Sequence, residues 1–129
     1  MVRIGTWNLQ GRWDQRHIDH IEAMSCDILL LTEVAHRVEL PGTRMHASRG
    51  RMAPRRYWAA VATRLPFRAL TDPHGASAMV EIHGRRVCSS VLPWRSCGTA
   101  PPWTGLTTAE KTEASRISDH DAYVIEASE

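Results

Sequence analysis

The sequence lacks several features that would assign it to a particular class. It has no run of about 18 or more apolar residues, which excludes a conventional transmembrane helix. The N-terminal residues contain no long apolar core followed by small residues, so no signal peptide is indicated and a cytoplasmic location is expected. Only 3 cysteines are present, and their wide spacing argues against a disulfide framework or a four-cysteine zinc site.

The remaining composition is that of an ordinary folded protein. Hydrophobic residues make up 43% of the chain and charged residues 23%, so global disorder is not predicted. A chain of 129 residues can bury enough surface for one stable core. Residues 1–129 are therefore expected to form a single domain.

The charge is small in total but uneven along the chain. The net charge is +2, made up of −2 over residues 1–35, +8 over residues 36–95 and −4 over residues 96–129. Lysine is nearly absent, and 15 of the 16 basic residues are arginine, which suits bidentate contacts with phosphate. The basic middle segment predicts either a nucleic-acid-binding face or an ordinary solvated surface. The candidate nucleic-acid contacts are Arg49, Arg51, Arg55 and Arg56.

Local patterns predict a strand, a helix and a second strand in the first third of the chain. Val2 to Asn8 is rich in β-branched and aromatic residues, and Asp14 can cap a helix that runs to about Ser25. The apolar run Asp27 to Thr32 is typical of a strand buried on both faces, as in a layered α/β structure. His17 and His20 lie three residues apart on the predicted helix and are interpreted as part of a solvated face.

The rest of the chain is predicted to contain mainly strands and loops. A long surface loop is expected between the second and third strands because that segment is polar, arginine-rich and interrupted by Pro-Gly. Two later strands face each other across a His-Gly turn. The predicted elements are a loop over 35–56, strands over 57–63, 77–82 and 86–92, a loop over 93–105, a short helix from Thr107 or Thr108, and a strand over 122–127.

Three short motifs place polar groups at the ends of predicted strands. They are TWNL at Thr6–Leu9, LTEV at Leu31–Val34 and SDH at Ser118–His120. Asn8 and Glu33 would lie side by side if their strands are neighbours in a sheet. An amide oxygen beside a carboxylate suits a hard cation such as Mg²⁺.

In this order, the motifs resemble those of the endonuclease/exonuclease/phosphatase superfamily, which includes deoxyribonuclease-I-like nucleases. The similarity includes AVATRLPF, runs from Arg3 to Leu92 and resumes from Ile117 to Glu126. It implies an α/β (α+β) fold: a partial four-layer α/β sandwich of mixed β-sheets flanked by helices.

The resemblance also implies roles for individual residues. Asn8 and Glu33 would hold Mg²⁺ or Mn²⁺, and Asp119 would support the metal or the groups around it. His120 would act on the attacking water or steady the scissile phosphate.

The sequence departs from the family pattern in its second half. The family's GDxN motif requires a second asparagine, and Asn8 is the only asparagine in the chain. An internal deletion is inferred near Ala114 or Ser115. Loss of core strands would leave sheet faces uncovered, so a homodimer that shields them is predicted.

Three interpretations follow from the sequence. The first is a divalent-metal-dependent phosphoesterase, a nuclease or phosphatase that hydrolyses phosphodiester or phosphomonoester bonds. The second is a catalytically inactive remnant that binds nucleic acid or a protein partner through its arginine-rich middle. The third is a shortened product that retains the fold without a function. The incomplete motif set leaves the choice between these open.

Overall fold

A computed structural model of the chain describes residues 1–91, 110–112 and 122–127. Within these ranges the chain forms one helix and ten strands. The helix is not long and apolar enough to cross a bilayer. The elements are β1 Val2–Asn8, α1 Gln15–Met24, β2 Ile28–Ala35, β3 Arg44–Ala47, β4 Arg51–Ala53, β5 Arg56–Thr63, β6 Arg68–Ala69, β7 Ser77–Ile82, β8 Arg85–Ser90, β9 Glu110–Thr112 and β10 Ala122–Ala127.

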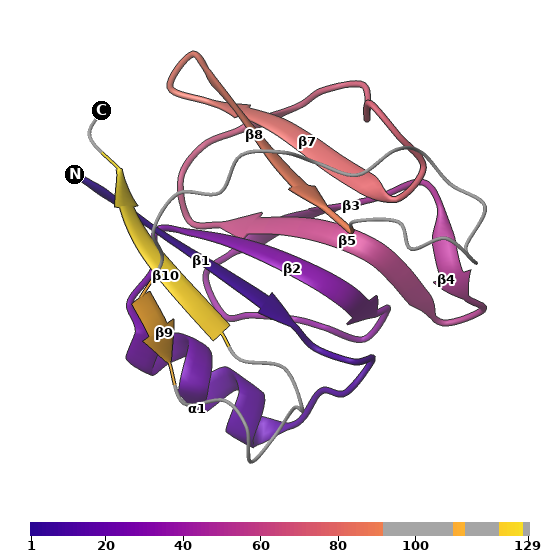
Figure 1. Ribbon diagram of the computed structural model, residues 1–129, viewed down its shortest axis with the longest axis horizontal. Coiled ribbons are helices and arrows are strands. Elements are labelled where there is room, and N and C mark those ends of the chain that lie inside the picture. Colours follow the sequence, from indigo (N-terminus) through magenta and orange to yellow (C-terminus); the bar gives the residue numbers. More distant parts are fainter. Residues whose placement is uncertain (92–109, 113–121, 128–129) are drawn as a thin grey trace.

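The strands form two stacked sheets. The larger sheet has the order β3-β5-β2-β1-β10-β9, with β4 also paired to β5, and it is mixed because β1 and β2 run parallel. The smaller sheet is antiparallel, with the order β6-β7-β8. Figure 1 shows α1 against one face of the larger sheet and the smaller sheet over the other face. This arrangement confirms the predicted α/β sandwich of mixed sheets, and the described residues form three of its four expected layers.

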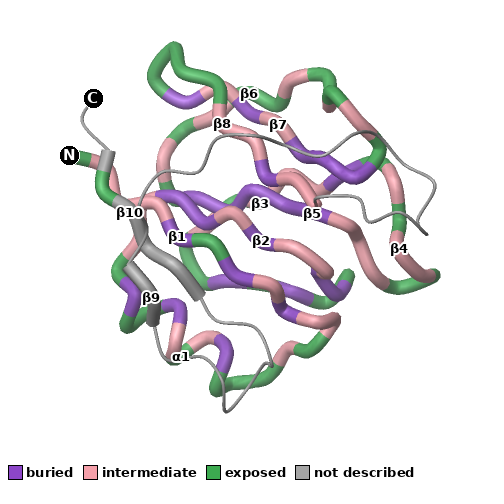
Figure 2. The backbone as a smooth tube through the Cα atoms, in the orientation of Figure 1, coloured by how far each residue is buried: buried purple, intermediate pink, exposed green. Residues whose placement is uncertain are grey.

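The larger sheet is buried on both faces, which explains the continuous apolar run in β2. Leu29 and Leu31 pack toward α1, whereas Ile28 and Leu30 pack toward the smaller sheet. Alternate residues of a strand point to opposite faces, so one strand contributes to two cores. Figure 2 shows buried backbone positions gathered along β2, β5 and β7, in the middle of the molecule.

The ends of α1 agree with the sequence pattern. The Asp14 carboxylate accepts a hydrogen bond from the backbone N–H of Arg16 at 2.8 Å, and His17 Nδ1 accepts one from the Asp14 N–H at 3.1 Å. At the other end, Ser25 is left-handed, with φ 51°, and closes the helix. The helix predicted between Asp14 and Ser25 is therefore confirmed.

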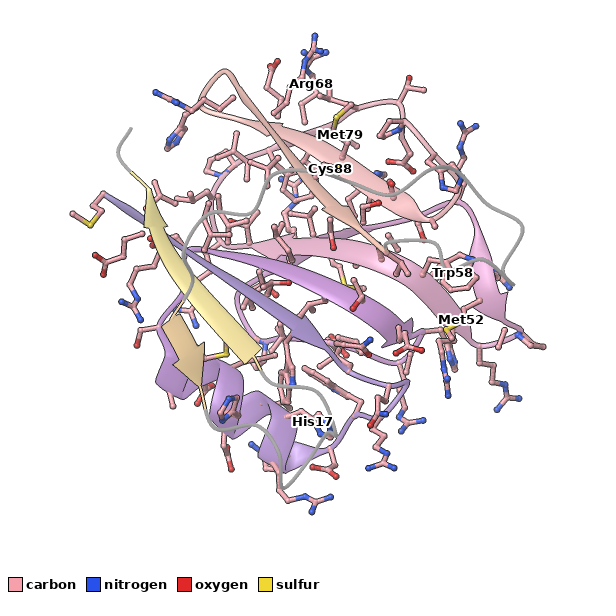
Figure 3. All side chains as sticks on the ribbon, viewed as in Figure 1. His17, Met52, Trp58, Arg68, Met79 and Cys88 are labelled. Atoms are coloured by element: carbon pink, nitrogen blue, oxygen red, sulfur yellow. The ribbon has the colours of Figure 1, made fainter. Side chains whose placement is uncertain are left out.

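The interpretation of His17 as a solvated residue is wrong. Its side chain is fully buried in the space between α1 and β1, where its ring stacks on Trp7 at 5.4 Å and lies 5.8 Å from Trp13 (Figure 3). His20 is half-buried and also contacts Trp7. The large indole of Trp7 fills the helix face of β1, so a planar imidazole can replace an aliphatic residue in this layer.

Two predictions about the middle and end of the chain are also corrected. The segment 35–56 is not one long loop, because β3 and β4 both pair with β5 and Val38 and Leu40 are buried. Residues 110–112 form β9, so the helix predicted from Thr107 or Thr108 is wrong over those residues. The predicted loop over 93–105 lies outside the described residues.

The Asp14 cap should contribute to stability in a pH-dependent way. Hydrogen bonding from the Arg16 side chain holds the pKa of Asp14 far below its ordinary value of 3.8. A carboxylate whose pKa is lower in the folded state than in the unfolded state stabilises the fold at pH values above its ordinary pKa. This stabilisation is lost as the pH falls toward the folded-state pKa. We expect Asp14→Ala to lower the Tm by a few degrees at pH 7, with the difference narrowing below pH 3.8.

Thermal melts followed by circular dichroism would measure this effect. Asp14→Asn is the matched control, because an asparagine cap retains the hydrogen bond to the helix without the negative charge. Its Tm at pH 7 should lie between those of Asp14→Ala and the wild type, because the helix cap is kept and the charged pairing with Arg16 is lost. Equal Tm values for Asp14→Ala and the wild type at pH 7 would mean that the cap does not stabilise the protein.

Candidate active site

The parallel pairing of β1 and β2 brings the first two motifs to one edge of the larger sheet. Asn8 is the register partner of Thr32, and Glu33 follows one residue later. The pairing continues past the strand end, where the Leu9 N–H donates to the Thr32 carbonyl at 2.9 Å and the Gly11 N–H donates to the Glu33 carbonyl at 2.7 Å. Backbone hydrogen bonds therefore fix the backbone of Glu33 relative to that of Asn8.

A tight turn after β1 orients the Asn8 side chain. Asn8 Oδ1 accepts a hydrogen bond from the Gln10 N–H at 2.9 Å, and the Arg12 N–H closes the turn on the Leu9 carbonyl at 3.0 Å. Gln10 and Gly11 both have positive φ angles, 53° and 68°, as in a type I′ turn. An amide oxygen carries two lone pairs, so Asn8 Oδ1 can accept this bond and still coordinate a cation.

Glu33 has an unusual backbone conformation for a residue inside a strand. Its φ angle is +50°, a left-handed value that a non-glycine residue adopts at a cost of about 1–2 kcal/mol. The distortion interrupts the alternation of β2, since Leu31 and Val34, three residues apart, both join the core beside α1. Of the described non-glycine residues, the others with positive φ are in turns or at the helix end: Gln10, Ser25 and His83.

Glu33 is half-buried as a residue, and its carboxylate has no hydrogen-bonding or ion-pairing partner among the residues that the structure describes. A carboxylate held at a strained position without a protein partner suits a cation ligand. Together, Asn8 and Glu33 offer the oxygen donors that Mg²⁺ prefers, and Mg²⁺ needs few protein ligands because it retains water molecules. Within the described ranges, no group of three or more His, Cys, Asp or Glu side chains forms a metal cage.

The third motif cannot be placed in the same way. Asp119 and His120 lie outside the described residues, as does the deletion inferred near residues 114–115. The backbone of β10 is described, and it pairs antiparallel to β1 with Thr6 opposite Tyr123. Strand β10 therefore begins, at Ala122, at the sheet edge where β1 ends in Asn8.

Three of the four predicted arginine contacts converge on a cavity beside this edge. The cavity has a volume of about 260 Å³ and is lined by His36, Arg51, Pro54, Arg55, Arg56 and Tyr57. Arg49 is exposed and does not line it. His36 and Tyr57 were not predicted as part of this site, because long-range strand pairing brings them there and no local motif marks them.

Direct contacts connect the cavity to the turn after β1. The guanidinium of Arg56 lies against the Cα of Gly11, where any side chain would displace it. The His36 N–H donates to the Arg55 carbonyl at 2.9 Å, which holds the end of β2 against the β4–β5 turn. The arginine cavity is thus linked to the turn that follows Asn8 through Arg56 and Gly11.

Two other polar features lie elsewhere. His46 Nε2 and Asp72 Oδ1 are 2.9 Å apart, and this pair joins β3 to the loop before β7. A larger cavity, of about 430 Å³, includes Cys26 and Arg64 at the opposite end of β2. Burial raises the pKa of the Cys26 thiol, which disfavours the reactive thiolate. Neither feature contacts Asn8 or Glu33.

Comparisons with known proteins agree with the fold. No protein-family model and no curated protein sequence matches the chain. Among solved structures, it is similar to the endonuclease domain of TRAS1, a telomere-specific non-LTR retrotransposon, with a TM-score of 0.53 and 20% identity over 71% of this chain and 46% of that chain. A humanized D. rerio TDP2 with 14 mutations matches with a TM-score of 0.39 and 14% identity over 67% of this chain and 44% of that chain.

The similarity to the TRAS1 domain confirms the fold class that the motifs predicted. The chain has a deoxyribonuclease-I-like α/β fold. It spans less than half the length of each of these two structures. Activity and substrate must therefore be inferred from the site itself.

Proposed function

We propose that the chain is a divalent-metal-dependent phosphoesterase in which Asn8 and Glu33 hold Mg²⁺ or Mn²⁺. The main support is the conformation of Glu33, which has a left-handed backbone one residue beyond the register partner of Asn8. Strain of this kind collects at functional sites, where the surrounding structure enforces it.

The chemistry divides between the metal and the side chains. A bound divalent cation supplies positive charge that stabilises the phosphate as it is attacked. Glu33 and Asn8 bind and orient that cation through their oxygens. We assign His120 the role of accepting the proton of the attacking water, one of the roles that the family resemblance implies for it. Asp119 would support the metal or the groups around it, as the resemblance also implies.

Nucleic acid is the substrate that the site favours. The cavity lined by Arg51, Arg55 and Arg56 borders the turn that carries Asn8, so a polyanion bound there would reach the metal. The similarity in fold to an endonuclease domain, that of TRAS1, is consistent with this choice. The cytoplasmic location and the homodimer remain predictions.

A second function has a specific observation in its favour. The single asparagine of the chain excludes a GDxN motif, so groups that position the nucleophile in the family are missing. A chain without them could bind nucleic acid through its arginines and not cleave it. Binding that weakens steeply with salt would then occur without hydrolysis.

Hydrolysis of plasmid DNA and of bis(p-nitrophenyl) phosphate would test the proposed function. We expect turnover of one or both with Mg²⁺ or Mn²⁺, complete loss in EDTA, and recovery when the metal is restored. Salt-sensitive DNA binding without any hydrolysis would contradict the phosphoesterase and favour the binding protein. Hydrolysis that persists in EDTA would contradict the assignment of Asn8 and Glu33 as metal ligands.

A further inference from the structure

We infer that the cavity between the end of β2 and the β4–β5 turn is a binding site for one phosphate group of the substrate strand other than the phosphate that is cleaved. This inference rests on the proposed function for the identity of the substrate, although binding in the cavity requires no metal. The cavity is defined by His36, Arg51, Arg55, Arg56 and Tyr57.

The size of the cavity suits a small anion. Its volume of about 260 Å³ lies just below the range of about 300–1,000 Å³ that is usual for sites that enclose a whole drug-sized ligand. A phosphate group with part of its sugar fits such a space, whereas a complete nucleotide would extend into solvent. The cavity should therefore recognise the strand by one phosphate rather than by a base.

The charge of the lining is entirely positive or neutral. Three guanidinium groups and one imidazole line the cavity, and no carboxylate does. Arg51, Arg55 and Arg56 form no ion pair with any carboxylate in the part of the chain that the structure describes. Like charges brought together without a counterion repel one another, so a bound anion would relieve this repulsion. The forked guanidinium matches two oxygens of one phosphate.

Two of the three arginine side chains, those of Arg51 and Arg56, contact other residues before any ligand binds. Arg51 lies over the ring of Tyr57 at 5.7 Å and also approaches the Pro54 carbonyl at 3.4 Å. The Arg56 guanidinium lies against Gly11. The His36 N–H holds only the backbone carbonyl of Arg55, whose side chain is exposed. Side chains that are already ordered lose less entropy on binding, which favours a specific site over a diffuse basic surface.

The position of the cavity relative to Glu33 identifies the phosphate. His36 follows Glu33 by three residues, so their Cα atoms lie at most about 11 Å apart. With the scissile phosphate at the metal, a phosphate one or two nucleotides along the same strand would reach the cavity. This phosphate could be the terminal group of a 5′-phosphorylated strand or an internal phosphodiester, since both present the same oxygens.

Oligonucleotide binding in EDTA would test the cavity without hydrolysis. Fluorescence anisotropy would compare two 3′-labelled single strands of eight nucleotides that differ only in a 5′-phosphate. We expect Arg51→Ala and Arg55→Ala to weaken binding about tenfold, since each removes a charged hydrogen-bonding partner. Arg49→Ala, two residues before β4 and outside the cavity, is the matched control and should weaken binding much less. Arg55→Lys should lose part of the affinity, because it retains the charge without the fork.

The two strands distinguish the source of the phosphate. Tighter binding of the 5′-phosphorylated strand, lost in Arg51→Ala and Arg55→Ala, would identify a terminal phosphate. Equal binding of both strands, with the same large losses, would identify an internal phosphodiester. Equal losses in Arg49→Ala, Arg51→Ala and Arg55→Ala would overturn the inference, because they would show a general charge effect. Absence of binding in the wild type would overturn it as well.

Failure of the cavity can be separated from failure of the proposed function. Metal-dependent hydrolysis that is not specifically weakened by Arg51→Ala and Arg55→Ala would support the phosphoesterase function and contradict a phosphate site in the cavity. Oligonucleotide binding that depends on Arg51 and Arg55, without any hydrolysis, would support the phosphate site and contradict the phosphoesterase function.

Discussion

Replacing Glu33 with alanine is expected to lower Mg²⁺-dependent phosphodiester hydrolysis by about 100-fold or more. Loss of a group that only supports a metal ligand already costs about 10–100-fold, and loss of the ligand itself should cost at least as much. The substitution should also abolish stabilisation by Mg²⁺, because a ligand that binds only the folded state raises the Tm, and raises it more the more tightly it binds. Steady-state hydrolysis and thermal melts with and without Mg²⁺ measure both effects.

Glu39→Ala is the matched control for the loss of one negative charge. Glu39 is exposed and lies a few residues after β2, so its removal should leave hydrolysis and the Mg²⁺-dependent rise in Tm unchanged. If both substitutions lowered activity equally, the effect of Glu33 would be one of general charge. Such a result would remove Glu33 from the metal site.

Glu33→Gly separates the strain of the backbone from the role of the carboxylate. Glycine adopts the φ of +50° without the penalty of about 1–2 kcal/mol that a non-glycine residue pays. Glycine also gives the unfolded chain more conformational freedom, which lowers the stability of the fold by roughly 0.4–1 kcal/mol, so the gain offsets this loss. The variant should therefore unfold no earlier than the wild type in the absence of metal, yet be as inactive as Glu33→Ala. Retained activity in Glu33→Gly would mean that the conformation, and not the carboxylate, matters.

The sequence was sufficient to predict the elements whose signals are local. Asp14 and Ser25 mark the ends of α1, and the apolar run before Thr32 marks a strand that is buried on both faces. The positions of Asn8 and Glu33 at the ends of two predicted strands also indicated that they would be neighbours. The parallel register of β1 and β2 pairs Asn8 with Thr32, directly before Glu33. These features depend on patterns of a few residues, which the chain displays without knowledge of its partners.

Features that depend on long-range pairing could not be predicted. Strands β3 and β4 are short and polar, and they become strands because β5 offers hydrogen bonds along one edge. The left-handed conformation of Glu33 and the convergence of Arg51, Arg55 and Arg56 follow from the same pairing. The buried imidazole of His17 likewise requires the position of Trp7 on a neighbouring element. In each case, the tertiary context overrode the local preference.

Replacing Trp7 with alanine is expected to destabilise the fold more than any other single truncation considered above. The side chain is only 1% exposed and is covered by the rings of His17 and His20, so its removal leaves a large cavity between α1 and β1. Truncations of buried aromatic residues cost about 3–5 kcal/mol, which is a large part of the roughly 5–15 kcal/mol that stabilises a typical domain. Urea unfolding should therefore show a much lower midpoint at an unchanged slope.

Two controls connect this loss of stability to the site. Trp13→Ala removes an indole that is only partly buried against the same core and should cost clearly less, while Trp7→Phe should retain most of the stability. Because Trp7 directly precedes Asn8, collapse of the layer between α1 and β1 should also weaken the response of the Tm to Mg²⁺. A loss of stability in Trp7→Ala no greater than that in Trp13→Ala would mean that this layer is not the main core. Asn8 would then have to be held in place by the turn at Gln10 and Gly11 and by the pairing of β1 with β2 alone.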